Sequence, residues 1–160
     1  MTQLFLGCIL CFNVINSGFI IERSKDANQI IYSIQTDEEG HLKDNPITIY
    51  WVKHTENGRI SSLTWIQQKY AYGLHFLSKT KENATFHFVS YAKQIFTVKK
   101  ADDNTFYVVT QIQKEEFVLN KIYIHLVGSS FWFPQIPKIE LFGVNLKTGT
   151  HVIKTLYLTK

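Results

Sequence analysis

The most constraining feature of this sequence is an alternation of apolar and polar residues that begins at Phe19 and continues through most of the chain. Because the side chains of a β-strand point alternately to its two faces, a period of two residues indicates half-buried strands. In residues 47–52, for example, the apolar side chains of Ile47, Ile49 and Trp51 share one face. Turn-forming residues interrupt the pattern about every eight to twelve residues, a spacing typical of sandwiches and barrels.

The alternation predicts a mainly β fold, namely a single antiparallel β-sandwich or flattened barrel of about nine or ten strands. The strongest turn signal is Asn57-Gly58, because both residues tolerate the positive φ of a tight hairpin. The regular alternation of strands with helices that marks a parallel α/β sheet is not seen. The expected strands are residues 19–23, 29–34, 47–52, 74–78, 85–91, 95–98, 105–111, 117–127, 139–144 and 151–158.

A helical period replaces the alternation near residues 62–72, and this is the one short helix that the sequence predicts. Ser61 or Ser62 is placed to cap its first turn, and Gly73 is placed to end it. The positions i, i+3, i+4 and i+7 of the expected helix are occupied by Leu63, Ile66, Gln67 and Tyr70.

The composition supports one folded domain. A chain of 160 residues with 12 Phe, 8 Tyr and 3 Trp can bury a single core, which excludes a disordered chain. The formal net charge is only +4, and the basic residues are spread along the chain. The nearest approach to a basic cluster, Lys99-Lys100, is followed at once by Asp102-Asp103. We therefore expect no nucleic-acid partner.

The N-terminal segment resembles a leader. Residues 1–18 carry no charged side chain, and they are mostly apolar before the small residues Ser17 and Gly18. This pattern predicts a secretory signal peptide at residues 1–18, a single β domain at residues 19–160, and export to the periplasm, the cell envelope or the extracellular space. Because the leader lacks the usual basic residues, two alternatives stay open. It could form a strand or buried helix of the domain, or an uncleaved anchor, which would then be the only membrane contact.

Both cysteines, Cys8 and Cys11, lie inside this leader. A mature domain would therefore contain neither a disulfide nor a reactive thiol, and packing alone would hold it together. The Cys-x-x-Cys spacing also occurs in redox proteins, but there it lies at the start of a helix in surroundings that lower a thiol pKa. An apolar leader supplies neither condition.

The histidines do not predict a metal site. His75 and His87 face each other if residue 76 of the expected hairpin opposes residue 86, and His125 would be a third ligand. A zinc site needs three or four ligands with supporting partners, and no Cys or acidic residue lies at a short fixed spacing from these histidines. We therefore expect exposed histidines and assign no metal.

No motif predicts catalysis or a cofactor. Consecutive carboxylates at turns are usually solvated, whereas a glycosidase needs two carboxyl groups that face each other across a cleft. The sequence also lacks a G-x-S-x-G elbow and a glycine-rich phosphate loop. We assign no catalytic residue and no cofactor, and we favour a non-enzymatic protein. The consecutive carboxylates are Asp37-Glu38-Glu39, Asp102-Asp103 and Glu115-Glu116.

An aromatic segment lies between two expected strands. Phe131, Trp132 and Phe133 are followed by Pro134, so they read as a loop. If exposed, these rings would form a protein interface or stack on sugars, because large exposed apolar patches mark interaction sites. The alternative is that the loop folds over the open end of the sandwich and fills it.

Ordered sequence blocks cover nearly all of the chain after the leader. They are Arg23-Ser24-Lys25-x-Ala27-Asn28-x-Ile30-x-Tyr32, Asn45-Pro46-Ile47-x-Ile49-Tyr50-Trp51, residues 66–73, Glu140-Leu141-Phe142-Gly143 and Thr148-Gly149. In this order they resemble an uncharacterised family of small, mainly bacterial proteins. In that family a domain of unknown function follows an N-terminal export signal. The resemblance implies an exported single domain and carries over no catalytic residue.

Polar, basic and aromatic residues from these blocks form the candidate ligand-binding set. Guanidinium and ammonium groups, side-chain amides and flat rings together suit an anionic or sugar-like ligand. The alternative is that they only support the fold. We therefore expect an exported binding module for a small molecule, glycan or lipid headgroup; the alternatives are an envelope structural or adaptor protein and a hydrolase with a dispersed carboxylate or histidine site. The set is Arg23, Lys25, Asn28, Tyr50, Trp51, Gln67, Lys69 and Tyr72.

Overall fold

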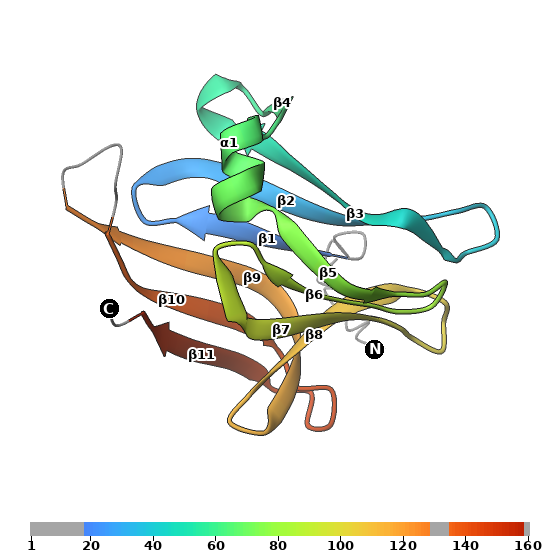
Figure 1. Cartoon of the computed structure of the whole chain (residues 1–160). Coiled ribbons are helices and arrows are strands. Elements are labelled where there is room, and N and C mark those ends of the chain that lie inside the picture. The colour runs from blue at the N-terminus through green and yellow to red at the C-terminus, as the bar shows by residue number, and fades with distance from the viewer. Residues whose placement is uncertain (1–17, 129–134, 159–160) are drawn as a thin grey trace, which may run out of the picture.

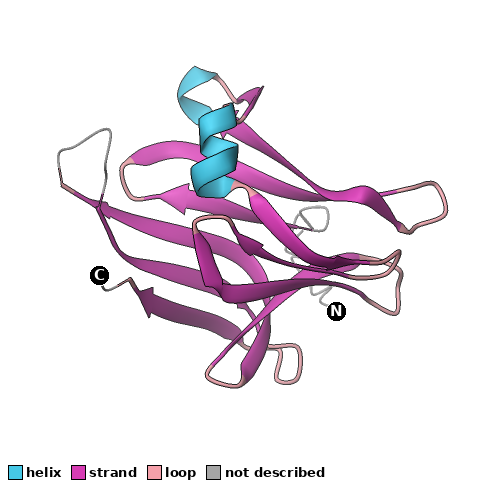
Figure 2. Cartoon of the chain, in the orientation of Figure 1, coloured by secondary structure: helices cyan, strands magenta, loops and turns pink. Residues whose placement is uncertain are grey.

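The computed structural model describes residues 18–128 and 135–158, which form mainly β-strands with one short helical segment (Figure 1, Figure 2). This confirms the predicted fold class. The strands are β1 (Gly18–Arg23), β2 (Asp26–Thr36), β3 (Leu42–Lys53), β4 (Arg59–Ser62), β5 (Leu74–Lys79), β6 (Ala84–Phe88), β7 (Tyr91–Lys100), β8 (Phe106–Ile112), β9 (Glu115–Val127), β10 (Gln135–Val144) and β11 (His151–Tyr157).

The long strand β9 organises the sheet, whose order is β4-β3-β2-β1-β9-β8-β7-β6-β5. The first part of β9 pairs with β8 and its later part pairs with β1, while its other edge pairs with β10, which continues to β11. Two sets of strands therefore leave the same edge of β9. We call β1–β4 the first wing and β5–β8 the second wing (Figure 1).

The core lies where the inner faces of the two wings meet. The Phe19 ring of the first wing stacks on Tyr32 at 4.5 Å between centroids and meets Phe88 of the second wing edge-on at 6.1 Å. Phe96 lies 6.4 Å from Phe19 on the same inner side. These are the alternating apolar residues of the sequence, so the period of two builds the core directly.

One strand pair departs from the expected antiparallel pattern, because β1 runs parallel to β9, with Ile20 beside Lys121 and Arg23 beside Ile124. A parallel pair needs a long crossover, and here the intervening strands of both wings supply it. The sheet of the described residues has eleven strands. The strand that the sequence prediction missed is the short β4.

The helical segment lies where it was expected, but its details differ. It consists of α1 (Trp65–Gln67) and one wider turn, η2 (Gln68–Tyr72). The cap is Thr64, not Ser61 or Ser62, which belong to β4. A second short helical turn, η1 (His54–Glu56), follows β3.

The apolar face expected for this helix is not buried. Leu63 is buried, whereas Ile66 and Tyr70 are 62% and 61% exposed. The physical reason is the length of the segment, because a helix of so few residues cannot present a continuous stripe to the core.

Gly73 follows the helical segment for a different reason from the one expected. Its φ is −68°, so it does not adopt the left-handed conformation of a helix-ending glycine. A Cβ atom at this position would lie 1.9 Å from the carbonyl oxygen of Gln68. The glycine is therefore required by the close approach of two backbone segments.

The expected hairpin register is confirmed, because His75 pairs with His87 and Phe76 with Phe86 in β5 and β6. Strand β1 begins at Gly18, one residue before the expected start of the domain. Cys8, Cys11 and the rest of the expected leader up to residue 17 lie outside the described residues. No helix within residues 18–128 and 135–158 is long and apolar enough to cross a membrane.

Candidate functional site

Part of the candidate ligand-binding set converges at one end of the first wing. Arg23, Asn28, Trp51 and Gln67 all line a polar hollow of about 220 Å³. Arg23 extends the inward row of β1 after Phe19 and Ile21, and Trp51 extends the inward row of β3, so both follow from the period of two. The pairing of β1 with β2 and of β2 with β3 brings the two residues together. The sequence alone does not specify this pairing.

Arg23 is held on several sides. Its guanidinium carbon lies 4.8 Å from the centre of the Trp51 ring and 6.0 Å from that of Tyr72. Its Nη1 donates to the Tyr72 hydroxyl at 3.1 Å, and its Nη2 forms an ion pair with Asp26. The Nε–H group is buried and has no hydrogen-bond partner among the described residues. The guanidinium is therefore fixed in place, and its buried Nε–H remains available as a donor.

Asn28 and Gln67 are occupied by local structure. The Asn28 Oδ1 atom accepts from the backbone N–H and the hydroxyl of Thr55, which fixes η1. The Gln67 Oε1 atom accepts from the Thr64 backbone at 3.0 Å and from Trp51 Nε1 at 3.3 Å. The oxygen atoms of both amides therefore support the local backbone.

Four members of the set do not line this hollow, although Tyr72 among them contacts Arg23. Tyr50 follows the alternation of β3 to the face opposite Trp51. Lys25 Nζ donates to the Gly128 carbonyl oxygen at 2.6 Å. Lys69 Nζ lies over the Trp65 ring at 4.9 Å, next to Tyr70.

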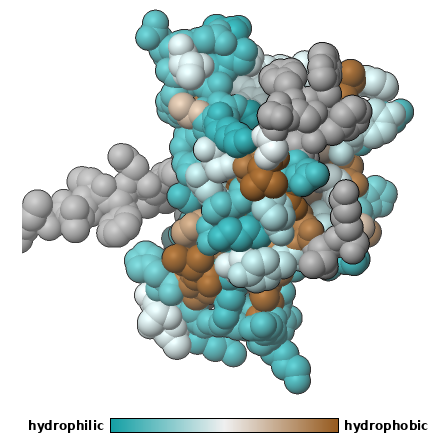
Figure 3. All heavy atoms as spheres, turned by 90° about the vertical axis from the view of Figure 1, so that its left-hand side faces the viewer, coloured by the Kyte–Doolittle hydropathy of each residue, from teal (hydrophilic) through white to brown (hydrophobic). Residues whose placement is uncertain are grey.

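A second and largely apolar cavity lies between the wings, beside β9 and β10. Its volume is about 300 Å³, and Arg23 is the only charged side chain in its described lining. Hydrophobic side chains reach the surface between hydrophilic ones on the side of the molecule shown in Figure 3. The lining is Ile21, Arg23, Tyr70, Ala71, Tyr72, Phe88, Ser90, Tyr91, Gln94, Phe96, Ile122, Ile124, Leu126, Ile136, Ile139 and Leu158.

Only Arg23 and Tyr72 of this lining were predicted to be site residues, because apolar cavity residues have the same pattern as core residues. The one available signal was the row Phe19-x-Ile21-x-Arg23, which puts a cation on the inward face of a strand. The other walls come from strands far apart in the chain, and only the topology brings them together.

Hydrogen bonds fix the rim of the cavity. The Tyr32 hydroxyl donates to the Tyr72 carbonyl oxygen at 2.8 Å, and burial raises the pKa of Tyr32 well above its ordinary value, so it stays a donor. The Ser90 hydroxyl donates to the Ala71 carbonyl oxygen at 2.6 Å. Because both bonds attach η2 to the wings, the helical segment forms a fixed wall.

A larger hollow of about 500 Å³ lies between the β8–β9 and β10–β11 turns. Its two carboxylates are already paired, since Glu115 binds Lys154 and Asn145 while Glu116 binds Lys99. Adjacent residues of a strand point to opposite faces, so Glu115 and Glu116 do not face each other across a cleft.

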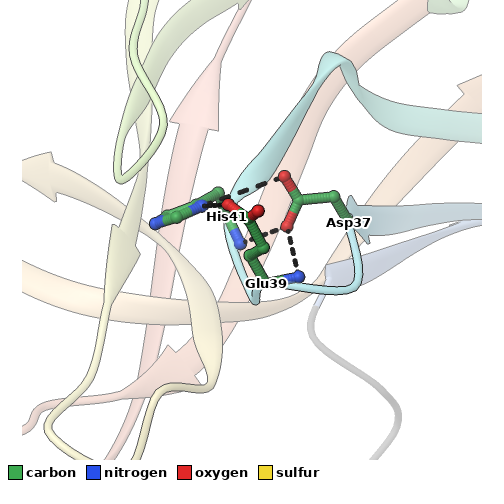
Figure 4. A group of neighbouring side chains, drawn as sticks. All are labelled: Asp37, Glu39 and His41. Carbon is green, nitrogen blue, oxygen red and sulfur yellow. Dashed lines mark hydrogen bonds and ion pairs between the residues drawn. The ribbon is translucent and has the colours of Figure 1, made fainter.

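Asp37, Glu39 and His41 bring their side chains together in the β2–β3 turn (Figure 4). His41 Nδ1 lies 3.4 Å from Glu39 Oε2 and 3.8 Å from Asp37 Oδ2. Asp37 Oδ1 accepts the backbone N–H groups of Glu39 and His41, and the bond from His41 lowers the pKa of Asp37 below its ordinary value. The sequence prediction named the acidic turn but missed His41. Asp37 and Glu39 are exposed and His41 is half-buried, and the hydrogen bonds of Asp37 account for the turn.

His75, His87 and His125 do not converge on one metal position. The rings of His75 and His87 lie 5.0 Å apart, and His87 Nδ1 contacts the Phe88 carbonyl oxygen at 2.9 Å. His125 instead donates from Nε2 to Glu140 at 2.6 Å on the β9–β10 pair. The structure therefore gives them no common ligand position.

The aromatic loop Phe131, Trp132 and Phe133 lies outside the described residues. Other exposed apolar side chains occur near α1, where Trp65, Ile66 and Tyr70 are exposed beside Lys69.

Together these features define a mainly β domain whose two wings enclose an apolar cavity with a single cation in its described lining. The chain belongs to the family described as a domain of unknown function, DUF4833, whose model matches residues 19–155. No curated protein and no solved structure matches the chain.

Proposed function

We propose that this protein is an exported, non-enzymatic binding module that takes the apolar part of a small molecule into the cavity between its wings. The observation that carries the proposal is the cavity itself. Its volume of about 300 Å³ lies at the lower end of the range of about 300–1,000 Å³ for ligand sites. Dry apolar cavities of about 150 Å³ already take up a benzene ring, so a larger hydrocarbon group has room here.

The lining favours one of the expected ligand classes over another. A sugar carries hydroxyl groups around its ring and needs several polar partners, because buried polar groups without hydrogen bonds are unfavourable. The described walls offer mostly aliphatic and aromatic side chains, with a few polar groups at the rim. A lipid-like molecule therefore fits better than a glycan.

Binding can be tested with phenylnaphthylamine, a neutral dye whose fluorescence rises in apolar surroundings. We expect saturable enhancement with the full chain. Ala71 lines the cavity, so Ala71→Phe would fill part of it and weaken dye binding about tenfold or more. Ala92 is exposed on β7 outside the cavity, so Ala92→Phe adds the same ring without filling it.

The pair of variants also separates the cavity from the apolar leader, which could itself take up dye. If Ala71→Phe and the Ala92→Phe control bind the dye equally, the cavity is not the binding site. Melting temperatures of both variants show whether each remains folded.

Two features support the proposal of export. They are the leader at residues 1–18 and the resemblance to a family whose members follow export signals. The test is N-terminal sequencing of protein recovered from outside the cytoplasm. Cleavage between about residues 17 and 19 is expected. Retention of Cys8 and Cys11 in the recovered protein would contradict removal of the leader.

A further inference from the structure

The charge distribution of the cavity narrows the class of ligand further. Arg23 is the only charged residue among the described lining residues, and its partner Asp26 lines only the neighbouring polar hollows. An apolar enclosure strengthens the attraction between opposite charges, because little water screens them. The cavity thus combines apolar walls with one positive end.

The guanidinium is also held in an orientation that suits an anion. Trp51 and Tyr72 contact it from two sides, so little freedom remains to be lost on binding. Its Nε–H is buried without a partner among the described residues. A carboxylate accepts two parallel N–H bonds from one guanidinium, and Nε–H can supply one of them.

Asp26 has a second anchor that lets Arg23 accept another anion. Its Oδ1 atom accepts the Asn28 backbone N–H at 2.8 Å while Oδ2 pairs with Arg23. The carboxylate therefore stays in place through the turn if the guanidinium shifts part of its bonding to a ligand. Asp26 is then a competitor whose removal should strengthen anion binding.

We infer that the ligand of this cavity is an anionic amphiphile, with a hydrocarbon body between the wings and its anionic group on the guanidinium of Arg23. This inference rests on the proposed function, because it assigns the chemistry of the same cavity. The single positive end and the spare Nε–H group specify the anionic group, and the apolar walls specify the body.

The test is displacement of phenylnaphthylamine from the full chain by decanoate and by decanol, which differ in the charge of the head group. Decanoate should compete about tenfold more strongly, as expected for a charge-assisted hydrogen bond. Acetate, which has the charge without the body, should not compete. Decyl phosphate, compared with decanoate, distinguishes a phosphate from a carboxylate head.

Two variants assign the preference to Arg23. In Arg23→Gln the ratio of decanol to decanoate inhibition constants should fall close to one, while dye binding persists. In Asp26→Asn, which leaves the cavity walls intact, the ratio should rise severalfold. The second variant keeps the inference testable if the first does not fold.

The outcomes distinguish failure of the anionic assignment from failure of the proposed binding function. If the dye binds in the cavity but decanoate and decanol compete equally, the anionic assignment is wrong and the binding proposal stands. An unchanged ratio in both variants would also overturn it. If Ala71→Phe leaves dye binding intact, the proposed function and this inference fail together.

Discussion

The Arg23 guanidinium lies 4.8 Å from the centre of the Trp51 ring, which joins the end of β1 to the inward face of β3. Trp51 is buried, and its Nε1 donates to the side chain of Gln67, the last residue of α1. One ring therefore orients the cation of the cavity and attaches the helical segment to the first wing.

Substitution of Trp51 should separate these two contributions. Trp51→Phe keeps an aromatic face beside Arg23 but loses the bond to Gln67, so we expect a loss of about 1–2 kcal/mol in the free energy of unfolding. Trp51→Leu loses both and should cost about 2–4 kcal/mol. Urea unfolding measures each value, and equal losses in the two variants would show that the aromatic face contributes nothing.

Phe19 should be among the residues whose loss most weakens the fold. It is 1% exposed and contacts Tyr32 of one wing and Phe88 of the other. We expect Phe19→Ala to lower the free energy of unfolding by about 3–5 kcal/mol. Ile153, which is 60% exposed on β11, provides the control, and Ile153→Ala should change it by no more than about 0.5 kcal/mol. Similar effects of the two substitutions would contradict the assignment of the core.

Thr64 should stabilise the helical segment through its side chain. Its hydroxyl accepts from the Gln67 backbone at 3.3 Å, and Gln67 Oε1 accepts from the Thr64 backbone in return. We expect Thr64→Ala to cost about 0.5–2 kcal/mol of unfolding free energy. Thr64→Ser keeps the hydroxyl and should stay close to wild type. Chemical denaturation followed by circular dichroism distinguishes them, and equal losses would argue against the cap.

The His125–Glu140 pair predicts a pH-dependent contribution to stability. The hydrogen bond from His125 lowers the pKa of Glu140 below its ordinary value, with a smaller effect of the nearby Lys138. A carboxylate with a lowered folded-state pKa stabilises the fold above its unfolded pKa, about 4.3, and this stabilisation is lost as the pH falls below that value. Glu140→Gln should therefore destabilise the protein at neutral pH and converge with wild type in acid.

Melting curves between neutral and acidic pH measure that convergence. Glu38→Gln removes the same charge from an exposed turn residue and serves as the control. A constant difference between Glu140→Gln and wild type at every pH would contradict the role given to the carboxylate.

The strands could be predicted from sequence because one physical rule, alternation between two faces, determines most of them. Rows such as Ile47, Ile49 and Trp51 show it without knowledge of their partners. The paired histidines His75 and His87 followed in the same way, because a short hairpin loop fixes the register locally.

The candidate site could be predicted only in part. Arg23, Asn28 and Gln67 were all selected by residue type, as a charged donor and two amides within the sequence blocks, and local structure occupies the two amide oxygens. The cavity itself was missed, since Ile124 and Ile139 have the pattern of ordinary core residues. The parallel pairing of β1 with β9, which sets the two wings apart, depends on residues about a hundred positions apart in sequence.

A titration of the isotopically labelled full chain with decanoate, followed by amide resonances, locates the bound ligand directly. We expect saturable shifts centred on Arg23, Ile124 and Ile139 around the cavity, with Ile153 on the exposed edge unchanged. Shifts confined to the outer strand, or none in the cavity at saturating decanoate, would contradict this expectation.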